Sequence, residues 1–84
     1  MNKAILIGTL GKDPEIGMAG NAKVAKMSVA TTPKWKDKDG NSKSDTQWHR
    51  VIAWEGVAAV CEKYIKKGSK VAIEGEIQYR EYEL

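Results

Sequence analysis

The sequence predicts an all-β domain in which a small antiparallel sheet curls over one helix. Three observations support this fold class. Apolar and polar residues alternate in several segments with the period of two that is typical of strands. Only one segment has the apolar spacing of a helix, and it follows three predicted strands and precedes a fourth. Strands that come before a single helix favour a curled antiparallel sheet over alternating parallel strands and helices.

The first predicted strand, Ala4–Leu10, is apolar on both of its faces. Alternation places Ile5 and Ile7 on one face, and Leu6 and Leu10 on the other. We therefore expect this strand to be central in the sheet or buried against another subunit, with Ile5 and Ile7 at an oligomer interface.

A loop and a second strand come next. Asp13-Pro14 and the glycines up to Gly20-Asn21 predict the loop, because these residue types are typical of turns. The segment Val24–Thr32 alternates and predicts the strand. Its inward residues are Ala25, Met27 and Val29.

A polar loop separates the second strand from the third. The loop is Asp37–Ser44, and its Asp39-Gly40 pair is typical of a hairpin tip. The third predicted strand is Gln47–Trp54.

The helix and the fourth strand complete the pattern. Apolar residues that recur at helical spacing predict one buried stripe, formed by Val57, Val60, Cys61, Tyr64 and Ile65. The fourth strand is predicted over Lys70–Tyr82, with a bend at Gly75. Its inward residues are Val71, Ile73 and Ile77.

This order of elements is that of a five-stranded oligonucleotide-binding (OB) barrel, whose helix lies between strands three and four. The chain of 84 residues is long enough for one domain only. It stops where a fifth strand would begin. We therefore expect one OB-fold domain over residues 1–84 that is incomplete at its C-terminus.

Composition and charge narrow the classes of function. The hydrophobic fraction of 42% and the charged fraction of 30% are ordinary for a globular protein. No unbroken apolar run approaches the roughly 20 residues needed to span a bilayer, and no signal peptide is recognisable, so we expect a cytoplasmic protein without a membrane partner. Residues 1–50 hold nine Lys and Arg against five Asp and Glu. Positive charge concentrated in one half favours an anionic partner, nucleic acid first, although a solvated basic surface gives the same count.

The third strand is the most informative segment for function. Alternation places Trp48, Arg50, Ile52 and Trp54 on an outer face, opposite the smaller His49, Val51 and Ala53. An exposed indole offers a flat surface on which a base stacks, and Arg50 between two indoles can neutralise a phosphate. The alternative is that both tryptophans pack in a core or a subunit interface.

A second aromatic site lies where strand two enters the polar loop. Trp35 stands among Lys34, Lys36 and Lys38. Basic residues interleaved with an aromatic are typical of a groove that follows a phosphate backbone. A surface tryptophan covered by lysine stems is the structural alternative.

No pattern in the sequence indicates an enzyme, a cofactor or a metal site. The single histidine, His49, and the single cysteine, Cys61, form neither a zinc-ligand cluster nor a base–nucleophile set.

Several co-linear motifs resemble bacterial single-stranded DNA-binding proteins along essentially all 84 residues. They are Met1-Asn2-Lys3-Ala4-Ile5-Leu6-Ile7-Gly8, Leu10-Gly11-Lys12-Asp13-Pro14-Glu15, Ser28-Val29-Ala30-Thr31, Trp35-Lys36-Asp37, Trp48-His49-Arg50-Val51, Lys66-Lys67-Gly68-Ser69-Lys70-Val71 and Glu74-Gly75. The resemblance implies an OB-fold homotetramer, associated with the nucleoid, that binds single-stranded DNA in replication, recombination and repair. It also implies an acidic tail, outside these 84 residues, that recruits replication and repair proteins.

The resemblance implies a site by position. The stacking residues would be Trp35, Trp48, Trp54 and Tyr82, and His49 would lie at the subunit interface. The cations expected to contact phosphates are Arg50, Lys34, Lys36, Lys43, Lys67, Arg80 and Lys3. Glu55-Gly56 departs from the Gly-Lys pair that is common in the family.

Two other functions stay open at this level. One is a primosome-type or RNA-binding OB module that uses the same face. The other is an OB-type protein-interaction adaptor, whose tryptophan fluorescence would not respond to single strands.

Overall fold

The computed structural model of the chain describes residues 1–78 and confirms the all-β class with one helix. Its elements in chain order are β1 (Ala4–Leu10), β2 (Glu15–Ala19), β3 (Ala22–Thr31), β4 (Lys34–Lys36), β5 (Ser42–Ser44), β6 (Gln47–Trp54), α1 (Glu55–Tyr64) and β7 (Lys70–Gly75). No helix among these residues is long and apolar enough to cross a bilayer.

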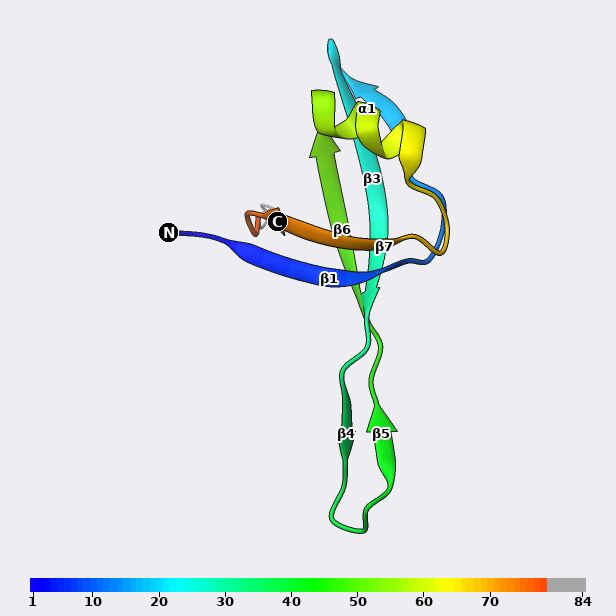
Figure 1. Cartoon of the computed structure of the whole chain (residues 1–84). Coiled ribbons are helices and arrows are strands. Elements are labelled where there is room, and N and C mark those ends of the chain that lie inside the picture. The colour runs from blue at the N-terminus through cyan, green and yellow to red at the C-terminus, as the bar shows by residue number, and fades with distance from the viewer. Residues whose placement is uncertain (79–84) are drawn as a thin grey trace, which may run out of the picture.

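Strand β3 organises the main sheet, in which every pairing is antiparallel. It pairs with β6 over most of its length. Its other neighbours are β2, at the beginning of β3, and β1, which meets it only at Thr9↔Ala30 and Leu10↔Val29. Before it reaches that contact, β1 runs across the molecule beside β7, with which it pairs from Ala4 to Thr9 (Figure 1). The hairpin of β4 and β5 projects away from this body (Figure 1).

The core lies between the inner face of β3 and helix α1. Ala25, Met27 and Val29 are buried there, as their alternation predicts. Ala58 and Cys61 of α1 pack against them. A contact between Lys23 Nζ and Glu62 Oε1, 2.8 Å apart, also joins β3 to the helix.

The predicted buried stripe of the helix is wrong in three of its five residues. Cys61 is buried and Ile65 is partly buried, whereas Val57, Val60 and Tyr64 are exposed. The apolar residues form two stripes, and the stripe of Ala58, Cys61 and Ile65 faces the sheet. Since Ala58 and Cys61 are small, they allow the helix to lie close to β3.

The loop predicted between the first two strands is instead partly a strand. Residues Glu15–Ala19 form β2 and pair with β3 through a two-residue turn at Gly20-Asn21. Gly20 has a φ of 62°, as the first central residue of a type II′ turn requires. The Gly20-Asn21 pair therefore forms a tight hairpin turn and is not part of a long loop.

The fourth predicted strand is shorter than expected. It ends at Gly75, so Gly75 is its last residue and not a bend within it, and Ile77 is exposed. The side-chain amide of Asn2 continues the pairing, donating from Nδ2 to the Ile77 carbonyl at 2.6 Å and accepting from the Ile77 N–H at 3.1 Å. Within residues 1–78 no strand bridges β6 and β7, so the five-stranded sheet is an open one here and not a closed barrel.

Candidate nucleic-acid interface

The outer face of β6 carries two exposed tryptophans. Trp48 is 61% exposed and Trp54 is 54% exposed, and Arg50 lies between them in the same alternation. His49, Val51 and Ala53 point toward the other side, where Ala53 is buried. The predicted faces of this strand are confirmed, and neither indole is a core residue.

The neighbouring strand adds a cation that the sequence interpretation missed. Lys26 of β3 is directly opposite Ile52 of β6, and Ser28 is opposite Arg50. Lys26 is exposed on the same outer face as the two indoles. Its outward position follows from the alternation of β3, so the signal was present in the sequence. The outer face therefore combines two ring surfaces with two positive charges.

The β4–β5 hairpin presents a third indole. Trp35 is 49% exposed and lies opposite Lys43, whereas Lys34 and Lys36 alternate with it on β4. An open hollow on the surface of the hairpin is lined by Lys34, Trp35, Lys36, Ser42, Lys43 and Ser44. Because the hairpin projects away from the core, no core residue covers the Trp35 indole in the described part of the chain. The predicted exposure of Trp35 is confirmed.

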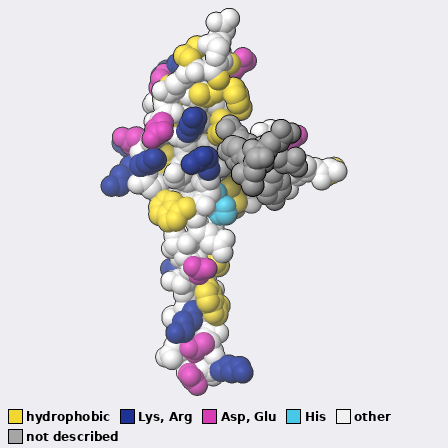
Figure 2. Space-filling model, turned by 180° about the vertical axis from the view of Figure 1, so that it is seen from behind, with side chains coloured by type: hydrophobic (Ala, Val, Ile, Leu, Met, Phe, Trp, Pro, Cys, Tyr) yellow, Lys and Arg dark blue, Asp and Glu magenta, His cyan; other side chains and the backbone are white. Residues whose placement is uncertain are grey.

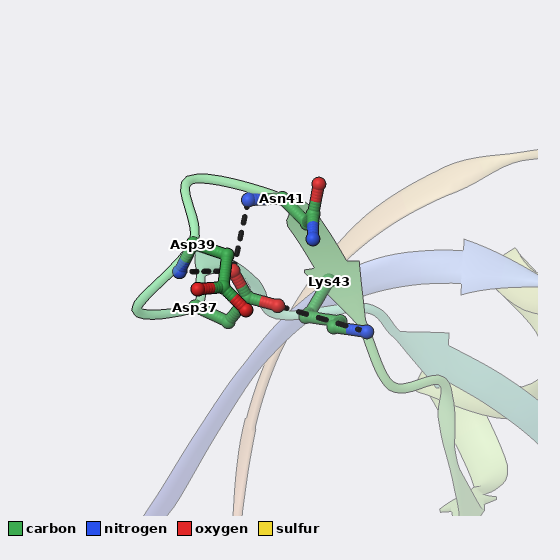
Figure 3. Close-up of polar contacts among 4 residues, drawn as sticks. All are labelled: Asp37, Asp39, Asn41 and Lys43. Carbon is green, nitrogen blue, oxygen red and sulfur yellow. Dashed lines mark hydrogen bonds and ion pairs between the residues drawn. The ribbon is translucent and has the colours of Figure 1, made fainter.

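An aspartate organises the tip of the hairpin (Figure 3). Asp37 Oδ1 accepts hydrogen bonds from the backbone N–H groups of Asp39 and Asn41, both at 2.9 Å. Its other oxygen, Oδ2, lies 3.8 Å from Lys43 Nζ. An exposed pair at this distance contributes little to stability. The Asp37 carboxylate does, however, place a negative charge beside Lys43, one of the predicted phosphate contacts.

Lys67 lies at the corner where β1 ends. Its backbone N–H donates to Asp13 Oδ1 at 2.8 Å, and the next N–H, of Gly68, donates to the carbonyl of Leu10 at 3.0 Å. The loop that contains Lys67 is thereby held beside Gly11, on the side of the sheet reached by the Trp48 ring. The role of Lys67 as a phosphate contact stays a prediction.

Not every predicted contact residue is brought to this face. Lys3 pairs with Glu74, where β1 runs beside β7. It lies six residues, or about 20 Å of strand, from the point where β1 meets β3. Arg80 and Tyr82 lie outside the described residues.

Figure 2 shows one side of the molecule, on which basic and apolar side chains lie on both the body and the hairpin. Acidic side chains are concentrated around the hairpin and at the edges of the body (Figure 2). A surface that carries both basic and apolar side chains suits a nucleic-acid single strand, which has both charged phosphates and flat bases.

The predicted interface residues lie on strands β1 and β6. Ile5 and Ile7 are 66% and 75% exposed on the free face of β1. His49 is partly buried, and its Nε2 lies 2.8 Å from Thr31 Oγ1. Each of these positions agrees with the side of the strand that alternation predicts.

Among residues 1–78 no three His, Cys, Asp or Glu side chains are close enough to hold a metal ion. Burial raises the pKa of the Cys61 thiol, so this cysteine is held in its unreactive protonated form.

Comparisons with known proteins agree with this geometry. Solved structures of similar fold include one described as a Plasmodium falciparum SSB complex with ssDNA, with a TM-score of 0.88 and 35% identity, which covers 100% of this chain and 75% of that one. A deletion mutant of the single-stranded DNA binding protein from Thermus aquaticus matches with a TM-score of 0.86 and 25% identity, covering 100% of this chain and 42% of that one. The fold is therefore the OB-fold of DNA-binding proteins.

The family model described as "Single-strand binding protein family" matches residues 1–84. The chain belongs to that family, whose members are non-enzymatic DNA-binding proteins. Relatives named single-stranded DNA-binding protein are 47% identical in Rickettsia felis and 46% identical in Rickettsia typhi, each over 98% of this chain. The chain spans 56% of the length of these relatives.

Proposed function

We propose that this chain binds single-stranded DNA without sequence preference, by stacking bases on Trp35, Trp48 and Trp54. The observation that supports this most directly is the outer face of β6, where two half-exposed indoles flank Arg50. Stacking tolerates every base, because every base has a flat π surface. The similar structure of the Plasmodium falciparum SSB in complex with ssDNA supports the same activity.

The phosphates are neutralised by cations around these rings. On the outer face, Arg50 and Lys26 contact phosphates. Lys67 contacts a phosphate at the corner of this face where β1 ends, and Lys34 and Lys36 contact phosphates along the hairpin. Lys43 contributes less, because Asp37 partly offsets its charge. Through this activity the protein acts in replication, recombination and repair, and it is associated with the nucleoid. Recruitment of replication and repair proteins through an acidic tail concerns a segment outside these 84 residues and stays a prediction.

We also propose that the chain self-associates, as a homotetramer, through the free face of β1. Ile5 and Ile7 form an exposed apolar pair there, and burying such a pair against a second copy removes it from water. From the family resemblance we also assign His49, on the side of β6 opposite to Trp48 and Arg50, to a subunit interface.

Tryptophan fluorescence tests the DNA-binding proposal. Addition of poly(dT) should quench the emission, and affinity should fall with salt at a log–log slope of about −0.7 for each phosphate contacted. Duplex DNA should bind far more weakly, since its bases are not available for stacking. Competition with a matched poly(rU) strand measures any preference for RNA. Unchanged emission with poly(dT) at low salt would contradict the proposal.

A further inference from the structure

The indole of Trp48 rests on the backbone of Gly11. Trp48 in β6 is directly opposite Ala30 in β3, and Ala30 is in turn opposite Thr9 of β1. The Trp48 ring extends over Ala30 and Thr9 and reaches Gly11, the residue that follows β1. A Cβ placed on Gly11 would lie 2.5 Å from Cζ3 and 2.6 Å from Cη2 of the indole. Real Cβ atoms do not approach a ring carbon so closely, so only glycine accommodates the ring in this position.

The backbone around Gly11 is held on two sides. The N–H of Gly11 donates to the carbonyl of Ser28 in β3 at 3.1 Å. The N–H of Leu10, one residue earlier, donates to the carbonyl of Ser69 at 3.0 Å. The position of Gly11 is therefore determined by both β3 and the loop before β7. A ring that rests on a fixed backbone is itself restricted in orientation.

The ring remains available despite this contact. Trp48 keeps 61% of its surface exposed, so Gly11 supports one part of the indole and leaves the rest for a ligand. Ordering a side chain before binding lowers the entropy lost when the ligand binds. We infer that Gly11 is a positioning residue for DNA binding, which acts by holding the indole of Trp48 ready for a base.

This inference rests on the proposed function, because it assigns Gly11 to the same surface. The substitution Gly11→Ala isolates the effect. The φ of Gly11 is outside the left-handed region, since the glycines with positive φ are Gly20, Gly40 and Gly68, so the backbone accepts alanine there. The added methyl group must therefore displace the ring.

Gly11→Ala should weaken binding to a dT oligonucleotide by about 5-fold to 150-fold, the range that corresponds to one lost base stack. The salt slope should not change, because no phosphate contact is altered. Gly75→Ala is the matched control: a Cβ there meets no atom of residues 1–78 within 4 Å, and the affinity of this variant should equal that of the unmutated chain. Binding by Gly11→Ala that equals the control overturns the inference.

A double-mutant cycle shows whether Gly11 acts through the ring. In a Trp48→Ala background, Gly11→Ala should have no further effect on affinity, because no indole meets the methyl group. An equal loss in both backgrounds overturns the inference. If Gly11→Ala alone unfolds the chain, the double variant should refold. A double variant that stays unfolded also overturns the inference.

A measurement without DNA separates the two proposals. The indole N–H resonance of Trp48, identified by its loss in Trp48→Ala, should shift in Gly11→Ala and not in Gly75→Ala. An unshifted resonance overturns the contact itself. If the resonance shifts but the unmutated chain does not bind dT, the proposed function fails and the contact stands.

Discussion

Val24 and Trp54 lie directly opposite each other in β3 and β6, on the outer face of the sheet. Val24 is nonetheless 6% exposed, whereas Trp54 is 54% exposed. Directly opposed side chains on one face have their Cβ atoms about 5 Å apart. The indole therefore covers Val24 with one side and offers the other to solvent. We expect Trp54 to contribute to folding as well as to the proposed binding.

Two substitutions of Trp54 separate these contributions. Trp54→Leu keeps an apolar cover over Val24 but removes the ring, so single-strand affinity should fall by about 1–3 kcal/mol with little loss of stability. Trp54→Ala should lose the same affinity and also about 1 kcal/mol of unfolding free energy, because Val24 becomes exposed. Fluorescence titration and urea denaturation measure the two quantities. Unchanged affinity in Trp54→Leu would exclude this ring from the binding surface.

The hairpin tip allows a gain of affinity to be predicted. Asp37→Asn keeps the Oδ1 acceptor for the N–H groups of Asp39 and Asn41 but removes the charge beside Lys43. Affinity for poly(dT) should rise at low salt, and the salt slope should steepen as Lys43 becomes a full phosphate contact.

Lysine variants provide the comparison. Lys36→Ala should weaken all strand sequences alike and flatten the slope by about 0.7. Lys23→Ala removes a cation that pairs with Glu62 on the helix side and should leave the slope unchanged. Equal effects of the two alanine variants would show that only net charge matters.

Glu55 begins the helix with a φ of 52°, in the left-handed region that non-glycine residues rarely occupy. Glu55→Gly and Glu55→Ala both remove the carboxylate, so their difference isolates the backbone strain. The glycine variant should be more stable than the alanine variant by about 1 kcal/mol. Thermal or urea denaturation of the two proteins measures this difference, and a more stable alanine variant would contradict the strain.

The buried thiol of Cys61 makes stability depend on pH at the alkaline end. Burial raises the pKa of this thiol, so the folded state holds the proton more tightly than the unfolded chain does. The resulting stability is fully present below the unfolded pKa and is lost as pH rises through the folded pKa. Denaturation midpoints should therefore fall more steeply at alkaline pH than those of Cys61→Ala, in which no thiol titrates. Parallel curves for the two proteins would argue against a shifted pKa.

The proposed self-association depends on β1. Ile7→Lys places a charge in the exposed apolar pair and should shift the sedimentation profile toward monomers. Val57→Lys is the control, since Val57 is similarly exposed but on α1. His49→Lys is a less selective test because it also disturbs the contact with Thr31. Dissociation by Val57→Lys alone would move the interface to the helix.

The sequence by itself determined which residues face outward on β3 and β6. Alternation is a local property of an extended chain, so it assigned Trp48, Arg50 and Trp54 to one face and Met27 and Val29 to the core without knowledge of the fold. The exposed Trp35 followed for a similar reason, because a polar hairpin tip has no core of its own.

Only the tertiary structure decided which of two apolar stripes of α1 is buried, because each satisfies the helical period equally. The choice depends on how closely the helix approaches β3, and the small Ala58 and Cys61 allow the closer packing. The contact between Gly11 and Trp48 has the same origin. It joins residues 37 positions apart, and no local pattern encodes a distance across three strands.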